Sequence, residues 1–241
     1  MNPAQSAYPS TFLTAAQANP DQRAAFIRRT YAHLALAILA FTGVEAWLLN
    51  SSLAESLIPL MLGHRFSWLI VIGCFMGVSM LANGLAQSRG NPGMQYVGLG
   101  LFVVAEAVVF LPMIYIAIGI TGSPEIVQTA GIITLMLVAG LTATVFITRA
   151  DFSFMGNILG IGFFIVIGLV VAGMLFGFSL GLWFSVLMVG FAAGSILYET
   201  SNILHRYSTE DHVAASLGLF ASVALLFWYI LQILLSFTSR D

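Results

Sequence analysis

The chain has 241 residues, of which 59% are hydrophobic and only 7% are charged, and its formal net charge is −2. Soluble domains carry about 25% charged residues, so a soluble fold could not cover this much apolar surface. The near-neutral charge without a basic patch argues against nucleic acid as a partner, and the absence of lysine excludes retinal, pyridoxal and lysine-nucleophile chemistry.

The first 25 residues are polar or small and include Pro3, Pro9 and Pro20, so we expect a flexible N-terminal tail. A span needs about 20 apolar residues to cross the hydrocarbon, and seven windows follow the tail: 30–49, 67–86, 95–117, 126–148, 157–176, 180–203 and 213–237. Because the runs are continuous and not alternating, helices are favoured over a barrel. The sequence predicts an all-α integral membrane protein, with residues 26–241 forming one seven-helix bundle.

Arginine placement predicts the orientation of this bundle, since short cytoplasmic loops are enriched in basic residues. If the N-terminus is inside, the inside segments hold Arg23, Arg28, Arg29, Arg89, Arg149 and Arg206. The outside segments then hold only Arg65 and Arg240. We therefore expect the N-terminus inside and the C-terminus outside.

Glycines recur at a spacing of four residues in three predicted spans: Gly73/Gly77, Gly156/Gly160 and Gly190/Gly194. Small residues at this spacing allow helices to approach closely in lipid. We expect these positions to serve packing within the bundle, with self-association as the alternative.

Ionisable residues inside a membrane are costly and mark candidate sites. Glu106 is the deepest, near the middle of the third span, and no arginine falls at mid-span to pair with it. It is either a proton or cation site, or a neutral carboxyl hydrogen-bonded to another helix. Glu199, near the inner end of the sixth span, is either a titratable gate or ion ligand, or an interfacial residue.

The remaining polar groups favour structural roles. Glu45 is expected to be partly exposed at the outer interface, and His33 to be a packing residue. Asp151 or Ser153 is expected to cap the N-terminus of the fifth span. The histidines do not cluster, and the sequence predicts no metal centre, no cofactor and no catalytic residues, so we expect no enzymatic activity.

Three stretches resemble the bacterial Bax-inhibitor (transmembrane BAX inhibitor motif) family. The first is 28–31. The second is 148–156, with Thr148, Arg149, Asp151, Ser153 and Gly156, and the third is 198–205, with Tyr198, Thr200 and Asn202. The resemblance implies a seven-helix bundle whose central helix is wrapped by the others, located in the bacterial inner membrane.

The resemblance also implies an acid pair, because many family members carry one aspartate in span six and one in span seven. That pair is held to gate a pH-dependent calcium leak. Here the corresponding positions are Glu199 and Ser222, so one acid is missing. Two close carboxylates cannot both ionise readily, and a glutamate that faces a serine lacks this coupling.

The third stretch and the ending 239–241 are similar to the branch of the family that modulates an FtsH-type membrane protease. This similarity implies that the protease is a partner and that the N-terminal tail is the end the protease grips. The alternative function is a pH-sensitive calcium leak or proton pathway through the bundle, with Glu106 and Glu199 as ligands or gates.

Overall fold

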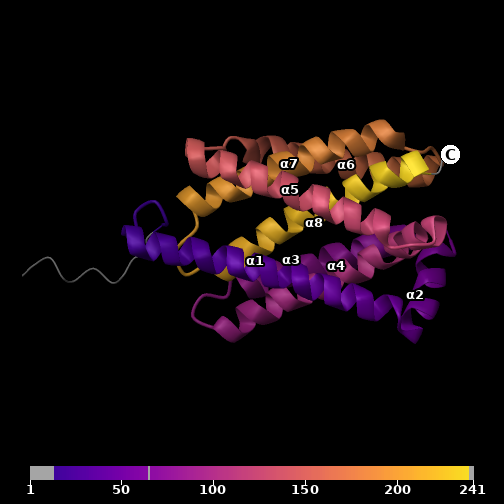
Figure 1. Ribbon diagram of the computed structural model, residues 1–241, viewed down its shortest axis with the longest axis horizontal. Coiled ribbons are helices and arrows are strands. Elements are labelled where there is room, and N and C mark those ends of the chain that lie inside the picture. The colour runs from indigo at the N-terminus through magenta and orange to yellow at the C-terminus, as the bar shows by residue number, and fades with distance from the viewer. Residues whose placement is uncertain (1–13, 65, 239–241) are drawn as a thin grey trace, which may run out of the picture.

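The computed structural model describes residues 14–64 and 66–238. This part of the chain folds into eight α-helices (Figure 1): α1 (Pro20–Leu49), α2 (Ser52–Leu62), α3 (Ser67–Ala86), α4 (Pro92–Thr121), α5 (Glu125–Thr148), α6 (Met155–Phe176), α7 (Gly181–His205) and α8 (His212–Thr238). All except the short α2 are long and apolar enough to cross a membrane. The predicted all-α bundle with seven spans is therefore confirmed.

The largest difference from the predicted boundaries is at the N-terminus. Helix α1 begins at Pro20, so residues 20–25 are helical and do not belong to the tail expected over 1–25. The side chain of Asn19 accepts a hydrogen bond from the Gln22 N–H at 2.9 Å, and Pro20 fits the first helical position because it lacks an N–H. Ala15 is fully buried, so the segment before α1 is also packed. Residues 1–13 lie outside the described part of the chain.

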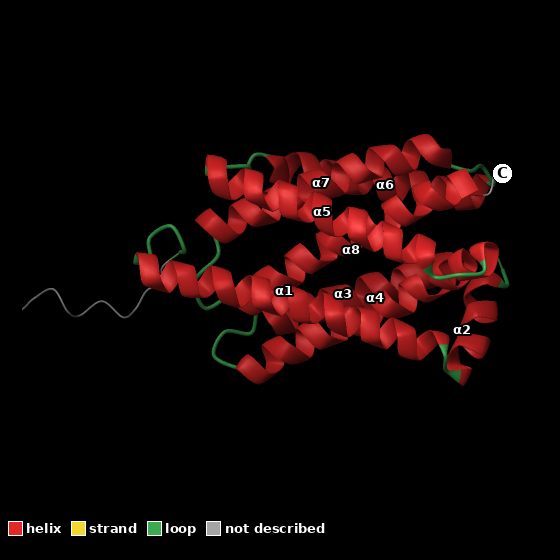
Figure 2. Ribbon diagram, viewed as in Figure 1, coloured by secondary structure: helices red, strands yellow, loops and turns green. Residues whose placement is uncertain are grey.

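Helix α8 forms the centre of the bundle. It packs against α1, α3, α4, α5 and α7, and its buried residues run from Val213 to Leu231. Helix α6 is peripheral: it packs on α7 and has no buried residue. Figure 2 shows these helices joined by short connections. The sequence resemblance implied a central helix wrapped by the others, and α8 has this place.

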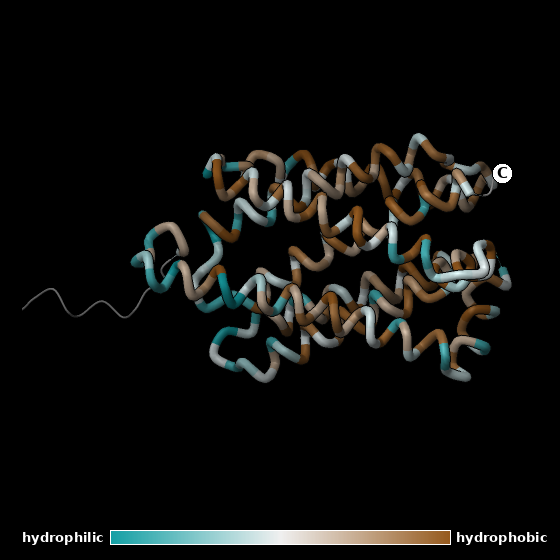
Figure 3. Tube along the Cα trace, in the orientation of Figure 1, coloured by the Kyte–Doolittle hydropathy of each residue, from teal (hydrophilic) through white to brown (hydrophobic). Residues whose placement is uncertain are grey.

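The connections divide between two ends of the bundle. The segment before α1, the α3–α4 loop, the α5–α6 turn and the α7–α8 loop lie at one end, which we call the N-terminal end (Figure 1). Helix α2 and the C-terminus of α8 lie at the other. Hydrophobic residues dominate along the helices, and many of the hydrophilic ones gather toward the ends (Figure 3). Which end faces the cytoplasm stays a prediction; Arg65 and Arg240 are outside the described residues.

Close helix approach depends on Gly98, which the spacing argument missed. A Cβ atom built on Gly98 of α4 would lie 2.5 Å from the Ala82 carbonyl oxygen and 2.6 Å from the Ala86 nitrogen of α3. Ala82 and Ala86 are the buried residues of α3, so α3 turns this face to α4. Glycine is the residue that permits such an approach.

Only some of the glycines in the predicted pairs lie at close contacts between helices. Gly156 and Gly194 do lie at the contact between α6 and α7, against Tyr198 and Met155 respectively. In contrast, nothing approaches within 4 Å of a Cβ built on any of the other four: Gly73, Gly77, Gly160 and Gly190. The expectation of close packing was wrong at these four positions, because they do not face a neighbouring helix.

We expect Gly98→Ala to lower the free energy of unfolding by about 1–3 kcal/mol, since backbone atoms must move to make room. Thermal unfolding in detergent measures this effect. Gly100→Ala on the same helix is the matched control, because nothing lies within 4 Å of its Cβ position. It should leave the unfolding temperature unchanged or raise it slightly, since alanine favours a helix more than glycine does. Equal effects of the two substitutions would contradict the close approach of α3 and α4.

Candidate functional site

The candidate site lies where α7 and α8 meet at the N-terminal end of the bundle. Glu199 of α7 packs against Gly218 of α8, where a built Cβ would lie 3.1 Å from the Glu199 Oε2 atom. The same carboxyl oxygen accepts a hydrogen bond from the Tyr207 hydroxyl at 3.3 Å. Glycine at position 218 thus makes room for a carboxyl between two packed helices.

Ser222 lies one helical turn beyond Gly218 on α8. Its hydroxyl donates to the Gly218 carbonyl at 3.2 Å, which is a common way to satisfy serine inside a helix. Glu199 and Ser222 therefore both lie next to Gly218, but each has its own hydrogen bond and no bond joins the two side chains in the described structure. The proposed role of this pair in gating stays a prediction.

The α7–α8 loop above this seam is held by the segment before α1. The Ala15 N–H donates to the Tyr207 carbonyl at 2.9 Å, and Thr14 pairs with Ser208 in an antiparallel bridge. Burial and the neighbouring Glu199 carboxylate raise the pKa of Tyr207 well above its usual range. The phenol consequently keeps its proton and stays a hydrogen-bond donor at physiological pH.

A second tie joins the same loop to the α3–α4 loop. Arg89 donates from Nη2 to Asp211 Oδ2 at 2.8 Å and from Nε to Oδ1 at 3.2 Å. This fork geometry matches a guanidinium to a carboxylate. The pair raises the pKa of Arg89. Asp211 is buried while Arg89 is half exposed, so the arginine supplies the counter-charge for a carboxylate with little access to water.

The two family-like stretches, 148–156 and 198–205, contact one another. The Phe152 N–H donates to the Ser201 hydroxyl at 2.9 Å, and that hydroxyl donates to Asp151 Oδ1 at 3.4 Å. Hydrogen bonds from Ser153 lower the pKa of Asp151, because they favour its charged form. Ser201 thus fastens the α5–α6 turn to α7.

The turn itself differs from the expected cap. Asp151 Oδ1 accepts the Ser153 N–H at 2.9 Å, and neither residue caps α6, whose N-cap is Phe154 without a side-chain bond. The Asp151 carboxylate is bound by the N–H of Ser153, which precedes the start of α6. Thr148 bonds back to the Thr144 carbonyl at 2.7 Å. Arg149 ends α5 in the left-handed conformation, with φ at 52°.

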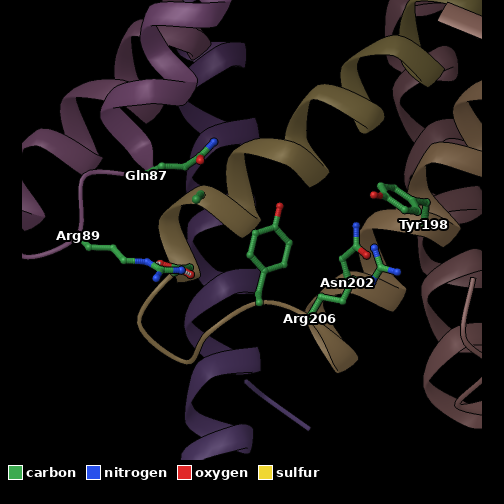
Figure 4. Close-up of a pocket in the computed structure, with 8 residues that line it drawn as sticks. Gln87, Arg89, Tyr198, Asn202 and Arg206 are labelled. Atoms are coloured by element: carbon green, nitrogen blue, oxygen red, sulfur yellow. Dashed lines mark hydrogen bonds and ion pairs between the residues drawn. The ribbon is translucent and has the colours of Figure 1, made fainter. Parts of the chain in front are cut away.

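A polar pocket of about 340 Å³ opens beside the α7–α8 loop (Figure 4). Tyr198, Asn202 and Arg206 line it from α7 and its C-terminus. Gln87 and Arg89 line the opposite side. Tyr207, Asp211 and Ala214 complete the lining. The family-like residues Tyr198 and Asn202 therefore face a pocket, whereas Thr200 is fully buried.

Glu106 and Glu45 belong to a different part of the bundle. Glu106 on α4 is buried and forms no hydrogen bond or ion pair with the described residues, so the expected partner on another helix is absent. One turn to either side stand Phe102 and Phe110, which contact Phe220 and Phe41 respectively. The structure does not pair Glu106 with Glu199.

Glu45 corrects the sequence interpretation. Its side chain was expected to be partly exposed, but the residue is only 4% exposed and neither carboxyl oxygen has a partner. Composition gave no signal for this burial, since Glu45 lies only one turn from the end of α1. Two buried acids without partners, Glu45 and Glu106, thus lie on the neighbouring helices α1 and α4.

The histidines were expected to be isolated, and two of them are not. The rings of His33 on α1 and His212 at the start of α8 lie 5.0 Å apart between centroids. His33 Nδ1 is hydrogen-bonded to the Arg29 carbonyl at 2.7 Å, which fits the packing role expected for it. Among the described residues no group of three or more potential ligands gathers as a metal site.

Sequence reasoning missed Tyr207, Ser201 and the Arg89–Asp211 pair. Ser201 bonds to Phe152, which lies 49 residues away in the chain. Tyr207 lies beyond the end of α7 and bonds back to Glu199, eight residues earlier. Neither contact follows from the spacing of residues along a single helix. Arg89 and Asp211 are 122 residues apart. The one available signal was a charge of each sign in two short loops predicted to share one end of the bundle.

Comparison with known proteins gives consistent matches. A family model described as "Inhibitor of apoptosis-promoting Bax1" matches residues 23–239. An uncharacterised protein of Pseudomonas aeruginosa is 28% identical over 92% of this chain and 93% of its own length. Bax inhibitor 1 of Schizosaccharomyces pombe is 29% identical, covering 100% of this chain and 86% of its own length.

The name of a third relative includes the protease that this relative modulates. The modulator of FtsH protease YccA of Escherichia coli is 39% identical to this chain over 101 residues, which are 42% of this chain and 45% of YccA. The match thus covers less than half of either protein. No solved structure matches the chain.

A double-mutant cycle tests the bond between Tyr207 and Glu199. We expect Tyr207→Phe to lower the free energy of unfolding by about 1 kcal/mol, and to cost much less when Glu199→Gln is already present. Chemical or thermal unfolding in detergent measures both. Tyr198→Phe is the matched control, because that phenol forms no side-chain hydrogen bond with residues 14–64 or 66–238. Equal cost of Tyr207→Phe in both backgrounds would show that the bond does not matter.

Proposed function

This chain belongs to the family of inhibitors of apoptosis-promoting Bax1, and from that premise we propose that it is a non-enzymatic multi-pass protein of the bacterial inner membrane that modulates an FtsH-type membrane protease. The observation that carries the proposal is the match to the E. coli protein named as a modulator of that protease. A direct test is capture of the tagged full chain from detergent-solubilised membranes. Recovery of an FtsH-type protease supports the proposal, and its absence under conditions that preserve the protease complex contradicts it.

The N-terminal residues are the proposed point of engagement. Residues 1–13 precede a segment that is tied to the α7–α8 loop through Ala15 and Thr14. Few main-chain bonds hold this segment, and segments with few contacts open locally at low cost in free energy. A protease that grips residues 1–13 therefore pulls first on this segment and on the loop that carries Tyr207. The apolar helices that follow in the chain resist being pulled out of the membrane.

Slow processing of this kind explains how a substrate can act as a modulator. The many apolar contacts of α8 with its neighbours must break before the chain leaves the membrane. While the protease is bound to this chain, it cannot degrade other membrane proteins, so the chain acts as a competing substrate. The modulation needs no catalytic residue in this chain.

Deleting residues 2–13 should lengthen the half-life of the protein in cells severalfold, because the protease loses its grip while the segment packed around Ala15 is kept. Pulse–chase labelling measures the half-life. A larger deletion would also remove Asn19, which caps α1, and would confuse loss of engagement with loss of stability. In cells depleted of the protease, the full-length and shortened forms should decay alike. An unchanged half-life in normal cells counts against the role of the N-terminal residues.

A second candidate function is a proton or cation pathway through the bundle. It is favoured by two buried acids, Glu106 and Glu45. Both oxygens of Glu45 are buried without a hydrogen-bond partner, and Glu106 forms no hydrogen bond with the described residues. Buried ionisable residues in membrane helices are commonly retained for transport. In the present conformation Phe41 and Phe110 meet at 5.2 Å between ring centroids, one turn from each acid along its own helix. A pathway would require these rings to separate.

Flux into proteoliposomes decides this alternative. If the bundle conducts, calcium or proton flux measured at two pH values should exceed that of empty liposomes, and Glu106→Gln should abolish it. Ser222→Ala is a useful comparison, because it alters the α7–α8 seam while both unpaired acids remain. No flux above the empty liposomes at either pH eliminates the pathway and leaves the first proposal untouched.

A further inference from the structure

The pocket beside the α7–α8 loop carries two polar groups that the rest of the molecule does not satisfy. Arg206 is exposed and lines the pocket, and no carboxylate of the described residues lies within ion-pairing distance of it. Asn202 is 8% exposed, and its Oδ1 atom has no hydrogen-bond partner. The Asn202 amide lies close to the Glu199 carboxyl, which can accept from the amide nitrogen but cannot supply a donor to the oxygen when it is ionised.

The charges that face the pocket leave a positive balance. Arg89 and Arg206 stand on opposite sides of it (Figure 4). Asp211 also faces the pocket, but its carboxylate is held by both the Nε and Nη2 atoms of Arg89. One arginine is therefore paired within the protein. Arg206 feels the Asp151 carboxylate only at a distance and forms no ion pair with the described residues, so its guanidinium can still bind a ligand. A buried acceptor and a guanidinium without an ion pair together favour an anion that also carries a hydrogen-bond donor.

The position of the pocket along the membrane normal further restricts the class of ligand. Its lining comes from the ends of spans: the C-terminus of α7, the first turn of α8 and the residue that ends α3. These positions lie where helices leave the hydrocarbon, which is the level of lipid headgroups and their phosphates. A guanidinium fork matches phosphate oxygens well, and basic pockets between transmembrane helices at this level bind anionic headgroups.

We propose that this pocket binds a phosphate ester that carries free hydroxyl groups, such as a glycerol phosphate headgroup. Arg206 binds the phosphate, and Asn202 Oδ1 accepts from a hydroxyl of the ligand. The Arg89–Asp211 pair forms the opposite wall and keeps the loop in place. The volume of about 340 Å³ lies within the usual range of about 300–1,000 Å³ for small-ligand sites. The site does not depend on protease modulation.

The test uses the purified full chain in detergent, with thermal unfolding as the readout. Phosphatidylglycerol should raise the unfolding temperature more than phosphatidylcholine, whose phosphate carries no free hydroxyl and is balanced by its own ammonium group. Arg206→Gln should remove most of this difference. Ala214→Phe should do the same without changing any charge, because Ala214 lines the pocket and a larger side chain fills it.

Arg28→Gln is the matched control, since it removes one exposed arginine at the same end of the bundle but outside the pocket, and it should respond like the unmodified protein. Soluble glycerol 3-phosphate distinguishes a soluble ligand from a lipid headgroup.

If glycerol 3-phosphate stabilises the unmodified protein but not Arg206→Gln, the pocket binds a soluble phosphate ester. If only phosphatidylglycerol stabilises the unmodified protein, the pocket binds a lipid headgroup. An equal response to phosphatidylglycerol in Arg206→Gln, Ala214→Phe and the unmodified protein overturns the proposal.

Discussion

The contact between Glu199 and the Gly218 backbone determines how the N-terminal end of this bundle is built. A carboxyl near the end of a span must find a polar partner or reach water, since burial without a partner is costly. Gly218 lets α8 approach α7 so closely that the carboxyl lies against its backbone, and Tyr207 supplies the donor. The loop that carries Tyr207 must consequently stay over the seam, and two other segments hold it there: the residues around Ala15 and Arg89 of the α3–α4 loop. The α5–α6 turn is fastened to the end of α7 through Ser201.

This arrangement separates two kinds of buried acid. Glu199 has a donor, lies close to the pocket and is linked through Tyr207 to the α7–α8 loop. Glu45 and Glu106 are buried and have no donor among the described residues, and each lies one turn along its own helix from a ring of the Phe41–Phe110 contact. Neutral carboxyls at those two positions avoid the cost of burying charge. Their presence is therefore compatible with a bundle that only resists extraction, and a transport role requires a second conformation in which water reaches them.

The sequence predicted the fold better than the site, and the reasons are physical. A stretch of apolar residues long enough to cross the bilayer has few alternatives in lipid, so seven spans could be placed without knowledge of their neighbours. The start of α1 was misplaced because its first turns are polar; caps such as Asn19 and Pro20 were the available signal. Contacts between helices depend on which face each helix turns inward, and periodicity says little about this when a helix is apolar on every side. For that reason Gly98 and Gly218 were missed, while exposed pairs such as Gly73/Gly77 were favoured.

The α7–α8 loop is the place where the proposed activities would affect one another. A phosphate ester bound between Arg206 and the Arg89–Asp211 pair adds contacts to the same loop that the residues around Ala15 hold from the other side. Pulling on the N-terminal residues strains this loop, whereas a bound headgroup strengthens it. By linkage, a ligand that binds only the closed loop makes opening harder in proportion to its concentration relative to its dissociation constant. Membrane composition at this end of the bundle would then set how readily a protease can begin to unfold the chain, without any change in the protease itself.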